Sequence, residues 1–454
     1  MVGTKGKKTL VTSFVCLALL LVLVIILENT LKPTNMLFTV LKKGAVYALV
    51  VVSMNVLNGF TGLFSLGQSG FMLLGAYTYA IFTIPVADRE NIYYLYNGAA
   101  LNFSFPDMFA SIFGEGYAAT FFGVILALIA AGIVAAFVAY LIGLPVLRLK
   151  SDYLAIATLG FGEIIRAIFQ WNALGKVTNG ANALKSFPTF SDFNITNADG
   201  EVILRLSTFF PFLIAGACIV VICMLINSSY GRAFKAIREN EIAAEAMGIN
   251  LAHHKRLSFM ISSFFAGVGG ALFAMFATQA QAKTFTSSMT YEILLIMVIG
   301  GIGSISGSCI GTFLYVACSE WWLRFLDSQV VFVSVGAPSR VIFLAAFAIV
   351  VVGGAVLLIR HEMKTKKRKW AMALLAAVAA ALMVWWVMFV ATGNLILPLA
   401  KNGFRMVVFS IVIMIIVLFF RRGIMGDKEL TDMAIALSQK MKAKKAAKTG
   451  EVAK

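Results

Sequence analysis

Charged residues are scarce in this sequence. Asp, Glu, Lys and Arg make up 13% of its 454 residues, about half of their usual share in soluble globular proteins. Proline, cysteine and histidine are also few, with 8, 5 and 3 residues. The shortage of charge excludes an ordinary cytosolic enzyme and a disordered regulator. The odd number of cysteines excludes a secreted disulfide scaffold.

The cysteines and histidines do not indicate a metal site. All cysteines lie in apolar stretches, and no histidine has a partner at the spacing of metal ligands. We expect the cysteines to be small buried hydrophobic side chains, and we expect neither a metal nor another cofactor. These residues are Cys16, Cys218, Cys223, Cys309, Cys318, His253, His254 and His361.

Hydrophobic residues are abundant: they make up 60% of the chain, and its mean hydropathy is +0.89. They occur in continuous runs rather than in alternating ten-residue segments, which excludes a transmembrane β-barrel. A membrane-spanning helix needs roughly 20 apolar residues. The sequence therefore predicts an all-α polytopic membrane protein with about twelve crossings, one of them short. The expected spans are residues 10–27, 44–57, 66–84, 118–144, 153–171, 209–226, 257–278, 293–302 (the short one), 307–325, 341–359, 371–390 and 404–420.

The basic residues predict the orientation of these spans. The net charge is +17, and the excess lies mainly in the stretches that an even number of crossings places on one side. The positive-inside rule makes this side the cytoplasm, so we expect a multi-pass membrane protein with both termini cytoplasmic. Lys42 and Lys43 are an exception at the outer end of the second span. The first run lacks a small-residue cleavage site, which favours a retained helix over a signal peptide.

Two glycine-serine stretches interrupt apolar runs, at residues 62–67 and 301–307. Paired interruptions of this kind can mark a substrate pathway. They can equally mark turns or close helix packing through small residues. The sequence leaves both interpretations open.

The polar stretch 227–256 differs from the rest of the chain and has the features of an amphipathic helix. Ser228 or Ser229 can cap its start, Gly248 can end it, and Asn250 can cap the next helix. Such a helix can lie in the lipid headgroups or dock into a groove on another protein. Its apolar side is mostly Ala and Ile and carries no Trp, which favours docking.

Several segments together resemble the LivM-type permeases of branched-chain amino acid ABC importers. They occur in the family's order and cover residues 40–325 and the end of the chain. The polar stretch GRAFKAIRENEIAAEAMGIN resembles the family's cytoplasmic loop, with Glu245, Ala246 and Gly248 at its motif positions. The other segments are NGFTGLFSLGQSGFMLLGAY (58–77), LPVLRLKSDYLAIATLGFGEIIRAIFQ (144–170), GGIGSISGSCIGTFLY (300–315) and FFRRGIMG (419–426).

The resemblance implies an ABC importer permease fold and import of branched-chain amino acids by alternating access. It also implies its partners: a homologous second permease, two cytoplasmic ATPase subunits and an extracytoplasmic substrate-binding protein. The chain itself has no Gly-x-x-x-x-Gly-Lys-Ser/Thr loop to bind ATP phosphates, so we expect no enzymatic activity of its own and no role for nucleic acid. We expect coupling to the ATPases through Arg238, Glu239, Glu245, Ala246 and Gly248.

A second set of residues is expected to line or gate the translocation path. Glu163 and Arg166 are three residues apart in an expected span, so they share a helix face and can pair. Ionisable residues within a membrane are functional candidates, although this pair can also be a packing salt bridge. Gln68 and Ser69 follow a glycine break and can face the path or form interhelical hydrogen bonds. Thr158 and Gly160 complete the set.

The chain departs from the family in two places. The spans 341–359 and 371–390 form an extra hairpin, and the outer segment 176–188 lacks the usual Gly-Gly-Pro. We expect five regions: 1–39 with the first helix, the permease core 40–326 with a coupling helix at 229–248, the hairpin region 327–403, the last helix 404–426 and a basic tail 427–454.

Other functions remain open at this stage. An ABC permease for urea or for other amino acids would have a similar sequence. An ion-coupled secondary transporter would need a titratable group in mid-membrane, for which Glu163 is the main candidate. No filter motif supports a channel.

Overall fold

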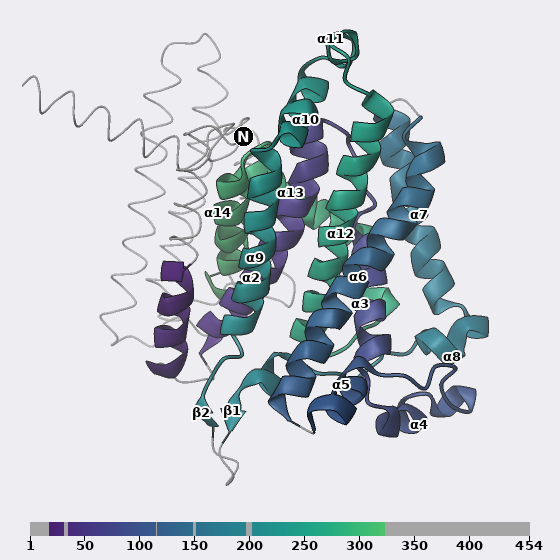
Figure 1. Ribbon diagram of the computed structural model, residues 1–454, viewed down its shortest axis with the longest axis vertical. Coiled ribbons are helices and arrows are strands. Elements are labelled where there is room, and N and C mark those ends of the chain that lie inside the picture. The colour runs from purple at the N-terminus through teal and green to yellow at the C-terminus, as the bar shows by residue number, and fades with distance from the viewer. Residues whose placement is uncertain (1–17, 31–34, 115, 149–150, 197–201, 323–454) are drawn as a thin grey trace, which may run out of the picture. The chain divides into compact units, whose positions relative to one another are not determined.

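The computed structural model describes residues 18–30, 35–114, 116–148, 151–196 and 202–322 (Figure 1). The described residues belong, up to Trp321, to one compact unit. The expected extra hairpin, the last span and the basic tail lie outside the described residues.

The described part is almost entirely helical (Figure 1). An apolar helix, Ala18–Thr30, comes first. One two-stranded antiparallel hairpin, β1 (Ile195–Thr196) and β2 (Val202–Leu204), precedes α9. The helices are α2 (Met36–Asn55), the π-helix η1 (Val56–Thr61), α3 (Gln68–Thr83), α4 (Arg89–Ile92), α5 (Phe105–Phe113), α6 (Tyr117–Val146), α7 (Ser151–Gln170), α8 (Gly175–Thr178), α9 (Phe209–Ile226), α10 (Ser229–Glu239), α11 (Glu241–Ala246), α12 (Leu251–Ala277), α13 (Ser287–Gly300), α14 (Ile305–Val316) and the π-helix η7 (Ala317–Trp322).

Five helical segments are long and apolar enough to cross a membrane: Met36–Thr61, Tyr117–Val146, Tyr153–Gln170, Phe209–Ile226 and Leu251–Ala277. Two further helix pairs pass the same test as bent units, so the described residues hold up to seven spans. Each of the five agrees with an expected span, because long apolar runs are the strongest signal in a sequence.

The two bent pairs differ from simple crossings. Gln68–Thr83 and Val86–Ile92 are bent by 101°, and Ser287–Gly300 and Ile305–Trp322 by 118°. The second pair replaces the two separate crossings expected at 293–302 and 307–325. It is a broken span or a re-entrant loop, and its bend lies in the glycine-serine stretch that the sequence marked as an interruption.

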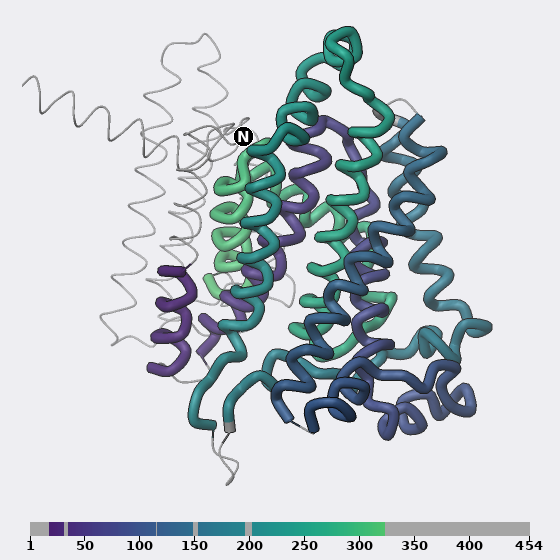
Figure 2. Tube along the Cα trace, in the orientation of Figure 1, coloured from purple at the N-terminus to yellow at the C-terminus, as the bar shows by residue number. Residues whose placement is uncertain are grey.

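Helix α12 lies at the centre of the unit, packed against α2, α3 and α6 (Figure 2). It is the most enclosed of the five spans, with 72% of its apolar window buried. Glycines allow its backbone to touch that of α3. A Cβ atom on Gly75 would lie 1.9 Å from the carbonyl oxygen of Gly267, and one on Gly270 would lie 2.0 Å from that of Met72. Close backbone approach through small residues is typical of membrane helices.

The two ends of the helix bundle carry different structures (Figure 1). Helices α10 and α11 project at one end, while α4, α5, α8 and the β-hairpin lie at the other. The chain enters α10 directly from α9, and it leaves α11 directly into α12. The polar segment singled out in the sequence is therefore built on two membrane-spanning helices.

Lys42 and Lys43, the two basic residues on the unexpected side, both have partners. Lys43 forms an ion pair of 2.5 Å with Glu320 of η7. Lys42 donates to the Ser207 hydroxyl at 2.7 Å, and the same hydroxyl donates to the carboxylate of Glu28 at 2.7 Å. These contacts tie α2 to η7 and to the segment before α9.

Candidate functional site

The polar connector, defined here as residues 227–250, consists of two short helices. The prediction of a single helix over 229–248 was wrong: α10 ends at Glu239 and α11 starts at Glu241. Asn240 between them has an extended backbone, and its side chain accepts a hydrogen bond from the Ala243 amide at 3.0 Å. Asn is among the preferred N-cap residues, so the break has a local cause.

The expected helix end at Gly248 and the expected cap at Asn250 are confirmed, whereas the expected serine cap is not, because no side-chain hydrogen bond caps the start of α10. Gly248 adopts a φ of +83°, and its amide donates to the Glu245 carbonyl at 2.9 Å. Glycine is favoured at such left-handed positions after a helix. Asn250 caps α12 by accepting from the His253 amide at 3.0 Å. Ser228 precedes α10, but its hydroxyl donates backwards to the Leu225 carbonyl.

The polar connector has a fixed inner side and an exposed apolar tip. Phe234, Ile237 and Ala244 are buried. Ile242 and Met247, in contrast, are 82% and 83% exposed. The residues expected to couple to the ATPases surround this tip, and all of them are exposed: Arg238, Glu239, Glu245, Ala246 and Gly248.

Helix α10 rests on η1, the π-helix that ends the first long span. A Cβ atom on Gly62, directly after η1, would lie 3.3 Å from the Cα atom of Arg238. The Lys235 ammonium lies 5.5 Å from the centre of the Phe60 ring. Single π-turns within helices occur frequently at functional sites. The polar connector therefore contacts an irregular segment of the membrane domain directly.

Asn55, which the sequence analysis did not identify, joins α2 to the bend between α13 and α14. Its amide nitrogen donates to the Ser304 carbonyl at 3.0 Å and to the Ser308 hydroxyl at 2.8 Å. Its carbonyl oxygen accepts from the Gly303 amide at 2.9 Å. The Asn55 side chain is fully buried. Because these partners are about 250 positions away, no local pattern could have revealed them.

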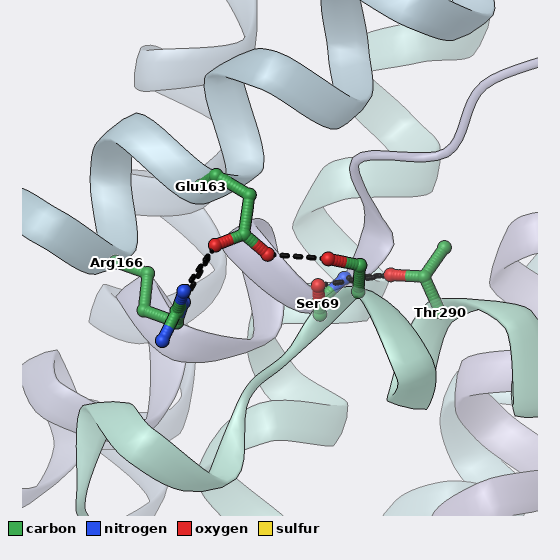
Figure 3. A network of polar contacts seen from close by, with 5 residues as sticks. Ser69, Glu163, Arg166 and Thr290 are labelled. Atoms are coloured by element: carbon green, nitrogen blue, oxygen red, sulfur yellow. Dashed lines mark hydrogen bonds and ion pairs between the residues drawn. The ribbon is translucent and has the colours of Figure 1, made fainter.

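Glu163 and Arg166 form the ion pair that their spacing predicts (Figure 3). Arg166 Nε donates to one carboxylate oxygen of Glu163 at 2.8 Å, and Nη2 contacts the same oxygen. The hydroxyl of Ser287, the first residue of α13, donates to the other oxygen. The Arg166 and Glu163 side chains remain 30% and 36% exposed. The pair therefore joins α7 to the start of α13 and still has an open side.

Three of the other path candidates are buried in hydrogen bonds between segments. Gln68 donates to the Ser53 hydroxyl at 2.7 Å. The Ser69 amide donates to the Thr290 hydroxyl at 3.1 Å, which in turn donates to the Ser69 hydroxyl at 2.9 Å (Figure 3). The Thr158 hydroxyl accepts from the Leu66 amide at 3.0 Å. These bonds fix the non-helical stretch 62–67 against α7, and the start of α3 against α2 and α13.

Gly160, the remaining candidate, lies on the exposed side of α7. A Cβ atom added there would have no neighbour within 4 Å. Gly160 precedes Glu163 by three residues, so the two positions share a helix face. Open space therefore adjoins the ion pair on its exposed side.

At the opposite end from the polar connector, tyrosines hold the segment 176–188 in place. Tyr93 donates to the Val177 carbonyl at 2.9 Å, and burial raises the pKa of Tyr93 to about 12 despite nearby Arg89. Leu184 and Ala280 pair through their backbones.

Within the described ranges, no group of three or more His, Cys, Asp or Glu side chains is arranged to hold a metal ion.

Comparisons with known proteins show the family of this chain. The family model for the permease component of branched-chain amino acid transport systems matches residues 36–352. The high-affinity branched-chain amino acid transport system permease protein LivM of Salmonella typhimurium is 32% identical over 294 residues, which are 61% of this chain and 61% of LivM. The Escherichia coli LivM is 31% identical over the same shares. A probable LivM of Methanocaldococcus jannaschii is 27% identical over 60% of this chain and 76% of its own length. The chain thus matches less than two thirds of the first two relatives, and no solved structure matches it.

Proposed function

This chain belongs to the family of permease components of branched-chain amino acid transport systems, and we propose that it is the permease subunit of an ATP-driven importer. In this proposal it forms the translocation path for branched-chain amino acids across the cell membrane. Separate cytoplasmic ATPase subunits supply the energy, and the chain transmits their movement to the path. It performs no ATP hydrolysis itself.

The observation that carries this proposal is the structure of the polar connector. Its inner side is anchored by buried Phe234 and Ile237, while Ile242 and Met247 are exposed at its tip. Isolated exposed apolar residues are common, but a pair on a projecting helix, beside charged Arg238 and Glu245, suits insertion into a groove of a partner protein. We assign this tip to the ATPase subunits.

The contacts below the polar connector give a physical route for coupling. When ATP binding closes the ATPase dimer, α10 moves with the groove that holds α11. Because α10 lies against Gly62 and Phe60, this movement displaces η1. Asn55 then carries it to the bend between α13 and α14. Such coupling requires two conformations that bind the partner differently.

We place the translocation path along the face of α7 that carries the Glu163–Arg166 pair. Ionisable side chains within a membrane almost always face the bundle interior or a water-filled cavity. Gly160 leaves open space on this face. Gln68, Ser69 and Thr158 support the broken segment beside it, and their bonds are suited to rearrangement between the outward-open and inward-open states.

The proposed assembly contains a homologous second permease, two ATPase subunits and an extracytoplasmic binding protein. The polar connector and both termini are cytoplasmic in this scheme, since the basic residues gather there. The end with α4, α5 and α8 then receives the amino acid from the binding protein.

Reconstitution of the complete complex in liposomes tests the proposal. We expect uptake of labelled leucine, isoleucine and valine that requires ATP and the binding protein, and that stops when the ATPase subunits carry an inactivated nucleotide site. Uptake driven by a proton or sodium gradient without ATPase subunits would instead establish a secondary transporter. Preferred uptake of urea or another amino acid would retain the ATP-driven mechanism and change its substrate.

A further inference from the structure

The ion pair on α7 has the chemical groups that an amino acid zwitterion requires. We infer that Glu163 and Arg166 form an exchangeable receptor in which the substrate carboxylate replaces Glu163 on Arg166 and Ser287, while the freed Glu163 binds the substrate ammonium group. This inference rests on the proposed function, because it names how the transported amino acid is held within the membrane.

The donors around Glu163 are arranged for a carboxylate. The Arg166 guanidinium binds one oxygen, and the Ser287 hydroxyl binds the other (Figure 3). Arginine is well suited to carboxylate recognition because its planar donors match the two oxygens. In this structure the chain's own carboxylate occupies the donors. An amino acid presents the same group and can take its place.

The exchange leaves the net charge unchanged. Before binding, one guanidinium and one carboxylate neutralise each other. After binding, two ion pairs exist, Arg166 with the substrate carboxylate and Glu163 with the substrate ammonium. Leaving a charged group within a membrane without its counterion is unfavourable, and the exchange avoids this for all four groups.

The surroundings provide room for an aliphatic side chain. Helix α7 is the least enclosed of the five spans, with 28% of its apolar window buried. Gly160 has no neighbour within 4 Å of the position of a Cβ atom. Ile156 and Ile164 on the same helix are 68% and 52% exposed. A branched aliphatic group beside the ion pair would therefore meet apolar surface and empty space.

The receptor is also connected to the coupling route. Ser287 begins α13, and Thr290, one turn later, bonds to Ser69 at the start of α3. The other end of α13 is the bend that Asn55 holds. Replacement of Glu163 by the substrate carboxylate at Ser287 thus changes the contacts at the start of α13. The other end of α13 is the end that moves with the polar connector.

Binding of labelled leucine to the detergent-solubilised complex, without the binding protein, tests the inference. We expect Glu163→Gln and Arg166→Gln each to weaken leucine binding about tenfold or more, since each removes a charge-assisted contact. Competing analogues separate the roles. 4-Methylpentanoate lacks the ammonium group and should lose little affinity in Glu163→Gln. Leucinamide lacks the carboxylate and should lose little in Arg166→Gln.

The charge-reversed double variant Glu163→Arg/Arg166→Glu distinguishes a receptor from a packing salt bridge. It keeps an ion pair at the same positions but places a guanidinium opposite Ser287. A structural pair would restore leucine binding, and this result would overturn the inference. We expect binding to stay about tenfold weaker than in the wild type. Glu320→Gln, which removes the 2.5 Å ion pair between η7 and Lys43 of α2, is the matched control and should leave leucine binding unchanged.

The outcomes also separate this inference from the proposed function. If the wild-type complex takes up leucine with ATP but the variants bind leucine normally, the receptor is wrong and the importer remains. Wild-type binding too weak to measure, with uptake intact, overturns the receptor as well. Absence of ATP-driven uptake by the wild type overturns the proposed function itself.

A normal elution profile and basal ATPase activity of each variant complex show that it has assembled. If Arg166→Gln does not assemble, Arg166→Lys replaces it, because lysine retains the positive charge.

Discussion

Gly62 lies directly against Arg238: a Cβ atom on Gly62 would be 3.3 Å from the Arg238 Cα atom and equally close to its Cγ. Gly62 also has a φ of +77°, which side-chain-bearing residues rarely adopt. The glycine thus meets two requirements at once, since it lets the chain turn after η1 and lets α10 approach the membrane domain. The absence of a side chain at Gly62 therefore lets Arg238 of α10 lie directly against the backbone after η1.

We predict that Gly62→Ala reduces leucine uptake per ATP hydrolysed severalfold while the complex still hydrolyses ATP. The added methyl group strains the backbone by about 1–2 kcal/mol, and it pushes α10 away from η1. Uptake and phosphate release should be measured on the same liposomes. Gly114→Ala is the matched control, because Gly114 has a φ of +80° but nothing within 4 Å of its Cβ position. Equal coupling ratios in the two variants would contradict the prediction.

A second prediction concerns the exposed tip of the polar connector. Ile242→Ser and Met247→Ser should weaken the association of the ATPase subunits, together by about tenfold or more, because each removes apolar surface that the partner groove would bury. Thermal stability of the chain alone should not change, since both side chains are more than four fifths exposed. Association can be measured with immobilised membrane subunits and soluble ATPase.

Ile203→Ser provides the control for this experiment. Ile203 is 65% exposed, but it lies in β2 at the other end of the bundle (Figure 1). We expect its substitution to leave ATPase association unaffected. If Ile203→Ser weakened association as much as the tip variants, the tip would have no specific role.

The sequence predicted those features that depend on neighbouring residues. Glu163 and Arg166 pair because residues three apart share a helix face, and Gly248 and Asn250 mark helix ends through their own backbone and side-chain preferences. Asn240 carries the same kind of local signal as Asn250, but continuous helical periodicity on both sides concealed it. To predict the break at Asn240, its preference for the N-cap position has to outweigh the helical periodicity of the residues on both sides.

The features that the sequence did not predict depend on residues far apart in the chain. Asn55 bonds to Ser304 and Ser308, and Glu28 bonds to Thr208; each partner is more than 170 positions away. Single polar residues in apolar runs are common, so no spacing rule selects these two. The bend between α13 and α14 was visible as a glycine-serine stretch, but its angle is set by packing against α2.

Asn55 itself gives a third prediction. Asn55→Ala leaves the Gly303 amide without its side-chain acceptor and should lower the free energy of unfolding by about 1–3 kcal/mol. We also expect slower leucine uptake at unchanged ATPase association, because the variant separates η1 from the α13–α14 bend. Thermal unfolding in detergent and uptake in liposomes provide the two measurements. Asn182→Ala, at an exposed position with one weak local bond of 3.4 Å, is the control, and an equal effect there would contradict the role of Asn55.

The last prediction concerns Glu28, which ties the first described helix to the start of α9. Its carboxylate accepts hydrogen bonds from the Thr208 amide at 2.8 Å and the Thr208 hydroxyl at 2.9 Å, and from the Phe209 amide at 3.3 Å. The first amides of a helix have no partner within the helix, and a carboxylate there is favourable. Glu28 and Thr208 are buried, so water cannot replace the carboxylate.

We expect Glu28→Ala to lower the free energy of unfolding by about 1–3 kcal/mol, because it leaves buried donors without acceptors. Glu28→Gln should lose less, since its amide oxygen can still accept from Thr208. Thr30→Ala is the control: the Thr30 hydroxyl bonds only to carbonyls of its own helix, at 2.8 and 3.3 Å. Thermal unfolding of the purified chain compares the three variants.

The mass of the mature protein should include residues 18–30, and removal of these residues by a peptidase would contradict a structural role for Glu28. Since α9 continues into α10, loss of this anchor should also reduce coupling, measured as leucine taken up per ATP hydrolysed.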